Sequence, residues 1–222
     1  MDEAQLREEL CRVGGSLFAR GYVHGTTGNL SARLADGAVL ITATDACLGD
    51  LGPAALVRVD AAGHPAPGAA QPSKTLTLHR RIYDTAPEAR AVIHTHSHHC
   101  VGLSLATPAD DDRDDFIAPI TPYFVMKVGH VPLIGYRRPG DPAVGDRVAE
   151  AIASAARRGA PIRAVMLSRL GPNVWHETPA AAMAVLEELE ETARLWRSAQ
   201  PKPAPLSAAQ IDELRSAFGA RW

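Results

Sequence analysis

Cysteines are scarce, the net charge is close to zero, and no long apolar run is present. The three cysteines are an odd number at unrelated spacings, which predicts no disulfide framework. A formal net charge of -2 gives no electrostatic basis for a nucleic-acid or membrane-surface partner. The start, MDEAQLREEL, is charged from residue 2 and lacks the apolar core of a secretory signal. No apolar run approaches the roughly 20 residues of a membrane-spanning helix. These absences predict a cytoplasmic protein without a nucleic-acid or membrane partner.

What is present is an alternation of helix-like and strand-like segments. A chain of 222 residues can form one α/β domain, and we predict a single domain over 1–222. Apolar residues at helical spacing predict helices, and short β-branched runs predict strands. Together they predict helices covering a mixed sheet, an α/β sandwich. Helices are predicted at 3–20, from a cap at Ser73, at 144–157, at 178–197 and, after the proline-rich spacer PKPAP, at 207–218. Strands are predicted at 38–44, within 55–65, before His94 and within 164–175. Short strands and turns are predicted at 121–142.

Histidines cluster at the end of one of these predicted strands, in AVIHTHSHHC. On a strand, side chains two residues apart point to the same face. His94 and His96 would therefore present two imidazoles side by side, as the chelation of one divalent metal ion requires. Taken alone, a His-x-His pair is equally compatible with polar residues in a loop.

A glycine-rich turn, HGTTGNLSARL, begins at His24. Gly25 and Gly28 enclose two threonines and are followed by Asn29, so the turn is rich in backbone N–H and hydroxyl donors. Such a loop can hold a phosphate or carboxylate. As a single signal it is weak, because turns of this composition are common connections.

Several stretches together resemble the class II aldolase/adducin family, and within it the branch of 3-oxo-tetronate 4-phosphate decarboxylases. They occur in the order of the family and span nearly the whole chain. The stretches are GTTGNLSARL, ITATDACLG, PSKTLTLH, HTHS, TPYFVMKVGHVPL, YRRPGDPA and EELEETARL.

The resemblance implies a metal-dependent lyase on a class II aldolase-like α/β/α sandwich with a mixed, mainly antiparallel sheet. It implies a small sugar-phosphate or sugar-acid substrate, a homotetramer, and one divalent metal, zinc by preference and manganese or iron as alternatives. Such a metal stabilises the enediolate that forms when a C–C bond breaks. Carried over to this chain, the resemblance makes His94 and His96 metal ligands and Tyr123 a proton donor. The implied substrate-binding residues are Thr26, Gly28, Asn29, Thr44, Asp45, Ser73 and Lys74.

The chain departs from the family pattern at the points that carry the chemistry. Leu170 stands where the family has its third histidine ligand, and leucine cannot coordinate a metal. Thr75 stands at the catalytic glutamate, and a threonine cannot act as a base near neutral pH. Asp45 replaces a glycine of the phosphate site, where a fixed negative charge opposes a phosphate. Arg169 is a candidate for binding a substrate carboxylate in compensation.

Three functions remain open on these residues. The preferred one is a class II aldolase-type lyase with a rebuilt site, whose third metal ligand comes from Asp45, His24, His98 or His99. A non-haem iron oxygenase, with two histidines and Asp45 as its facial triad, would suit a substrate without phosphate. A non-catalytic binding or scaffold protein would explain the lost groups, but it gives no reason for paired imidazoles.

Overall fold

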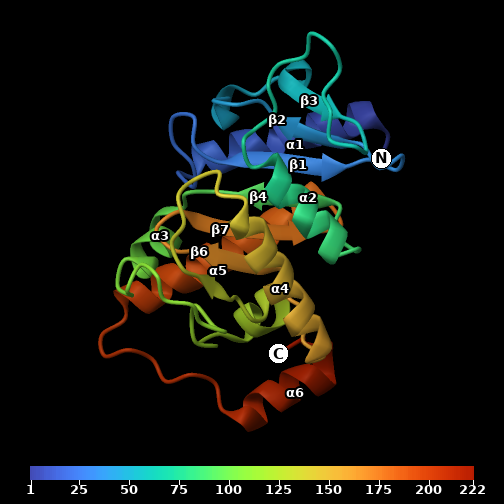
Figure 1. Cartoon of the computed structure of the whole chain (residues 1–222). Coiled ribbons are helices and arrows are strands. Elements are labelled where there is room, and N and C mark those ends of the chain that lie inside the picture. The colour runs from blue at the N-terminus through green and yellow to red at the C-terminus, as the bar shows by residue number, and fades with distance from the viewer.

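Seven strands form one sheet that carries the site, and the computed structural model describes all 222 residues (Figure 1). The strand order is β3-β2-β1-β4-β7-β6-β5. Every neighbouring pair is antiparallel except β5 and β6, so the predicted mixed, mainly antiparallel sheet is confirmed. The strands are β1 (Asn29–Arg33), β2 (Val39–Thr42), β3 (Leu56–Val59), β4 (Ala91–His94), β5 (Leu133–Ile134), β6 (Ala164–Leu167) and β7 (Gly171–His176).

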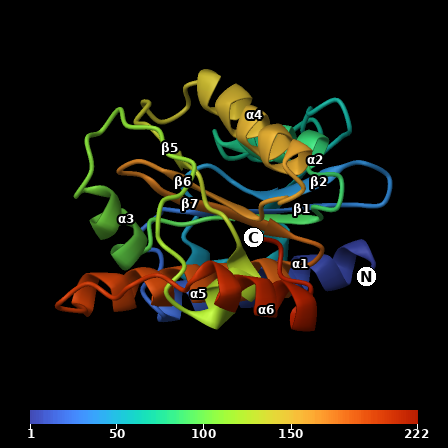
Figure 2. The same ribbon diagram turned by 90° about the horizontal axis from the view of Figure 1, so that it is seen from below.

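Helices cover both faces of the sheet. In Figure 2, α2 and α4 lie on one face, and α1, α5 and α6 lie on the other. Each face has its own buried apolar cluster. One cluster includes Ile82 of α2 and Val148 of α4, and the other includes Leu10 of α1 and Leu189 of α5. The α/β sandwich is therefore confirmed. The helices are α1 (Glu3–Ala19), α2 (Leu76–Thr85), α3 (His98–Ser104), α4 (Ala143–Arg157), α5 (Pro179–Ser198) and α6 (Ala208–Phe218).

Three local expectations need correction. Ser73 does not cap α2; the N-cap is Thr75, and its side chain makes no capping bond. Residues 29–33 form a strand, β1, that was not predicted because these residues were assigned to the glycine-rich turn. Within 121–142 only β5 is a strand, and Phe124–Val128 forms a π-helical turn. None of the helices is both long enough and apolar enough to cross a membrane.

Strand β1 shows how alternation positions the site. Leu30 and Ala32 point into the cluster under α1 and α5, so Asn29 and Ser31 point to the face covered by α2 and α4. Register pairs Asn29 with His94 on β4, and His94 with Asn173 on β7. A row of polar side chains therefore crosses the ends of three central strands on one face.

Candidate active site

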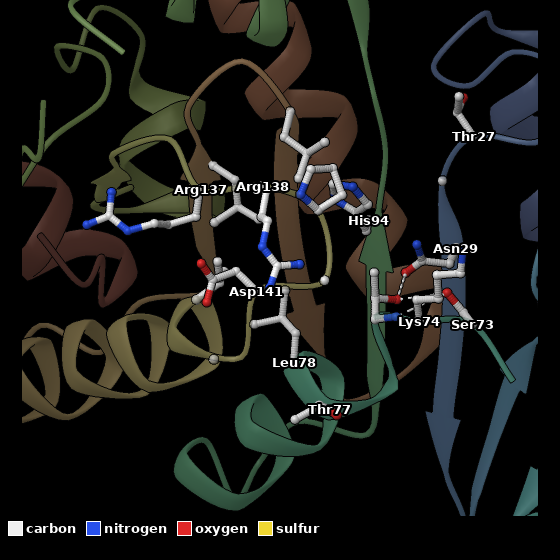
Figure 3. Close-up of a pocket in the computed structure, with 18 of the residues that line it drawn as sticks. Thr27, Asn29, Ser73, Lys74, Thr77, Leu78, His94, Arg137, Arg138 and Asp141 are labelled. Carbon is white, nitrogen blue, oxygen red and sulfur yellow. Dashed lines mark hydrogen bonds between the residues drawn. The ribbon is translucent and has the colours of Figure 1, made fainter. Parts of the chain in front are cut away.

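A cavity of about 320 Å³ opens beside this polar row. Figure 3 shows residues of the glycine-rich turn and β1 on one side of it and residues of the β5–α4 loop on the other, with His94 between them. The fold thus brings together segments that are far apart in the sequence. Residues within 26–29, 43–45, 73–78, 94–96, 134–145 and 167–170 contribute to its lining.

His94 is held in a single orientation and in one protonation state. Its ring is buried, and Nδ1 lies 3.0 Å from the carbonyl oxygen of Pro172. A carbonyl only accepts, so Nδ1 carries the proton and Nε2 keeps a free lone pair. Burial, and secondarily the neighbouring His96, lowers the pKa of His94 to about 3. His94 is therefore a neutral imidazole near pH 7, the form that binds a metal.

His96 lies in the loop just after β4, with its ring centroid 5.1 Å from that of His94. Burial, followed by the nearby His24, lowers the pKa of His96. The expected side-by-side imidazoles are present, and both line the cavity. Their role as metal ligands stays a prediction.

The glycine-rich turn approaches the histidine strand too closely for a side chain at Gly28. Its φ is +80°, and a Cβ there would lie 2.9 Å from the carbonyl oxygen of His94. Thr27 Oγ1 donates to the backbone carbonyl of His24 at 2.7 Å and also accepts from the His24 N–H at 3.1 Å. The turn is thus fixed by its own hydroxyl, and Thr26, Gly28 and Asn29 all line the cavity.

Thr75 has a structural partner where the family pattern has its catalytic carboxylate. Its hydroxyl donates to Asn29 Oδ1 at 2.8 Å and lies 3.0 Å from Ser73 Oγ. This chain of polar groups orients the Asn29 amide at the cavity wall. Lys74 lines the same wall and makes no ion pair within the chain.

The turn between β6 and β7 places Leu170 in the cavity and Arg169 outside it. Arg169 is exposed, with φ +62°, and does not line the cavity. Leu170 adds to an apolar wall that includes Leu78, Ile134 and Val144. The site therefore has an apolar surface where the family pattern has an imidazole.

Sequence reasoning missed the loop that closes this wall. Arg137, Arg138 and Asp141 line the cavity. Figure 3 shows Arg138 directed inward, toward the space near His94, and Arg137 directed away. The signal was available as paired arginines beside a Pro-Gly turn in YRRPGDP, a stretch that was interpreted as a turn and as part of the family pattern without a role for its arginines.

All seven predicted substrate-binding residues line this cavity, whereas two of the predicted catalytic residues do not. The cavity brings together Thr26, Gly28, Asn29, Thr44, Asp45, Ser73, Lys74 and Thr75 with the histidine pair. Tyr123 is 62% exposed and, like Arg169, is absent from the lining. The candidate ligands His98 and His99 lie on α3, where their ring centroids are 5.3 Å apart at an interplanar angle of 88°.

The donors present fit only part of a metal site. Two neutral imidazoles suit a divalent ion, but a catalytic zinc takes three protein ligands and leaves a fourth position open. No group of three His, Cys, Asp or Glu side chains in the chain is placed to hold a metal ion. The residues, as they lie, do not form a complete site.

Fold and cavity together define a class of protein. The chain matches the Class II Aldolase and Adducin N-terminal domain over residues 8–197, and it belongs to this family. Class II aldolases use a divalent metal.

Among individual relatives, the chain is 53% identical to a 3-oxo-tetronate 4-phosphate decarboxylase of Cupriavidus necator, over 99% of both chains. It is 41% identical to the protein of that name in Escherichia coli K12, over 96% of this chain and 97% of that one. The crystal structure of YgbL from Klebsiella pneumoniae superposes with a TM-score of 0.84 at 42% identity, over 97% of this chain and 100% of that one. The predictions of this family and of a carbon–carbon lyase are confirmed at that level.

Proposed function

We propose that the chain is a lyase that decarboxylates a small phosphorylated 3-oxo sugar acid. The observation that carries this proposal is one cavity with an anion-binding wall on each side of a histidine pair. On one side lie the glycine-rich turn, Ser73 and Lys74; on the other lies Arg138. A substrate with phosphate at one end and, at the other, an oxygen that gains negative charge during the reaction matches both walls.

The phosphate would lie on the glycine-rich turn. Backbone N–H groups beside Gly28, the Asn29 amide held by Thr75, the Ser73 hydroxyl and the Lys74 ammonium supply hydrogen bonds and one positive charge. Asp45 lines the same cavity and opposes a dianion, so Lys74 also serves to offset its charge.

Decarboxylation suits a site without the glutamate. The C1–C2 bond breaks, its electron pair moves toward the 3-oxo oxygen, CO₂ leaves, and C2 gains one proton. The reaction requires a cation near the developing enolate and a proton, but no base to begin it. Aldol cleavage instead begins with removal of a hydroxyl proton, which Thr75 cannot accept.

The remaining residues would bind the reacting end of the substrate. The Arg138 guanidinium would stabilise the charge developing on the 3-oxo oxygen. The wall around Leu170 disfavours a charged carboxylate and accepts neutral CO₂. His94 and His96 would hold a divalent metal, zinc first, whose chemistry when bound is to act as a Lewis acid toward oxygen. Because their ligand set is incomplete, no step above depends on it.

The test is CO₂ release from 3-oxo-tetronate 4-phosphate generated in situ, measured above the spontaneous rate. Arg138→Ala should lower kcat/KM about 100-fold, because one donor to a developing oxyanion is lost. Arg137→Ala, the neighbouring arginine that points away, should cost far less. A folded wild-type protein that adds nothing to the spontaneous rate would overturn the proposal.

A further inference from the structure

An acidic segment, DDDRDD at residues 110–115, runs beside the start of the β5–α4 loop. The backbone of this segment pairs with β5, because Arg113 and Leu133 exchange two N–H···O=C bonds of 3.1 and 2.9 Å. A Cβ at Gly135 would lie only 2.6 Å from the carbonyl oxygen of Asp110. The two segments are therefore in close backbone contact where the loop begins.

The carboxylate of Asp112 reaches both ends of this loop. Its Oδ1 accepts a hydrogen bond from the Gly135 N–H at 2.7 Å, directly after β5. Its Oδ2 forms an ion pair with Arg147, near the start of α4. Residues 136–142, which include Arg138, lie between these two partners. One side chain thus holds the loop that carries Arg138 at its beginning and at its end.

Arg147 depends on this ion pair more than an exposed arginine would. Its side chain is 25% exposed, its Nη1 is buried without a hydrogen-bond partner, and Asp112 is its only ion-pair partner in the chain. Loss of Asp112 would leave a partly buried cation unpaired, which favours movement of Arg147 and of the loop next to it. The Asp112 side chain is itself 52% exposed, so the pair contributes little to global stability. We therefore expect a local effect on the loop rather than unfolding.

The contact with the loop is specific to Asp112 and is not a general property of the acidic segment. Asp111 pairs with an arginine of the same segment, and Asp115 pairs with His130. Asp114 is exposed, and its side chain makes no hydrogen bond or ion pair. Asp114 therefore offers a matched control for a change of charge in this segment.

We infer that Asp112 is a positioning residue, which fixes the β5–α4 loop so that Arg138 points into the cavity. The inference rests on the proposed function, in which the Arg138 guanidinium stabilises the developing oxyanion. Figure 3 shows Arg138 directed toward the space near His94. A displacement of about 1 Å would remove much of that stabilisation. Asp112 has no contact with the glycine-rich turn on the other side of the cavity, so phosphate binding there should not change.

The first test measures decarboxylase kinetics on the full chain. Asp112→Ala should lower kcat about 10-fold and change KM by less than about twofold, because only an interaction of the transition state is weakened. Asp112→Asn keeps an acceptor for Gly135 but no charge for Arg147, and its kcat should lie between the two. Asp114→Ala should change neither parameter. In an Arg138→Ala background, Asp112→Ala should add less than about twofold, because a residue that acts through Arg138 has no effect once Arg138 is gone.

The second test does not require activity. Hydrogen exchange over residues 135–144, which contain hydrogen-bonded amides at both ends of the loop, should be faster in Asp112→Ala than in wild type or Asp114→Ala. Unchanged exchange, or the same fold loss of kcat with and without Arg138, would overturn the inference. An inactive wild-type protein would instead overturn the proposed function, and faster exchange in Asp112→Ala would then still support Asp112 as the residue that holds the loop.

Discussion

At the scale of single residues, two residues in or next to the site have a backbone conformation that favours glycine. Asp45 has φ +60° and Arg169 has φ +62°. Aspartate tolerates the left-handed region because its short side chain can bond locally, but a long side chain gains no such compensation. The strain at Arg169 is of order 1 kcal/mol. Asp45 lines the cavity, and Arg169 directly precedes Leu170, which also lines it.

Replacing Arg169 by glycine should therefore stabilise the protein by about 1 kcal/mol, measured by urea unfolding. Because the side chain is exposed and outside the lining, decarboxylase kcat/KM should stay within a factor of about two. A large loss of activity in a folded variant would restore the sequence-based hypothesis that Arg169 binds the substrate.

Thr75 and Leu170 should together decide which reaction the site supports. The double variant Thr75→Glu, Leu170→His returns a carboxylate and an imidazole to the cavity. It should raise metal affinity, but it should not raise kcat/KM for CO₂ release from 3-oxo-tetronate 4-phosphate, because the proposed reaction needs no base and uses the apolar wall at Leu170. A large gain in decarboxylase activity would contradict that mechanism. The Asn29–Thr75 hydrogen bond is lost in this variant, so Thr75→Val is its control.

At the scale of elements, α6 is attached more weakly than the other long helices. It buries one residue, Ile211, and begins at a capping box in which Ser207 and Gln210 exchange side-chain and backbone bonds. After the helix, the Trp222 ring stacks on His130 with centroids 4.2 Å apart. The C-terminal segment is thus held by a cap and by the contacts of the Trp222 ring with His130 and Phe124 rather than by a broad apolar face.

Ser207→Ala should destabilise α6 by about 1 kcal/mol, because an N-cap acceptor is lost. Hydrogen exchange should become faster across Ala208–Phe218 while β4 and α5 keep their protection. Equal acceleration in the core would show that α6 unfolds only with the whole domain.

At the scale of the whole molecule, two buried histidines couple the stability of the fold to pH. Nδ1 of His79, on α2, lies 2.7 Å from Oγ of Ser31, on β1. Burial of the His79 ring, and to a lesser extent the nearby His94, lowers the pKa of His79 to about 3. His94 has a similarly lowered pKa. In the unfolded chain the pKa of each histidine returns to about 6.5. Between about pH 3 and pH 6.5 the unfolded state therefore binds more protons than the folded state.

Stability should therefore be full above about pH 6.5 and fall as the pH decreases toward 3, by at most about 1.4 kcal/mol per pH unit for each histidine. Urea unfolding at pH 7, 6 and 5 with a chelator present measures this slope. His79→Gln should reduce the slope by the amount that corresponds to about one fewer proton taken up on unfolding. Identical slopes in the two proteins would contradict the contribution of His79.

The predicted homotetramer offers a role for Tyr123, which is exposed and outside the cavity of its own chain. If it donates a proton to a neighbouring subunit, Tyr123→Phe and Arg138→Ala proteins should each be nearly inactive alone. Mixed and reassembled, they should regain activity through hybrid sites that carry neither change. No recovery in a hybrid confirmed by native mass spectrometry would exclude a shared site.

The sequence by itself determined the helices, most strands, the family and the histidine pair, because periodicity and a His-x-His spacing are local properties. It also determined that Leu170 and Thr75 could not supply the usual chemistry. Only the tertiary structure decided what surrounds them. Strand register set Asn29 beside His94, and the β5–α4 loop, more than 40 residues beyond the histidines in sequence, aimed Arg138 at them. Local patterns cannot specify contacts between distant segments, because these depend on how the sheet pairs and how its loops pack.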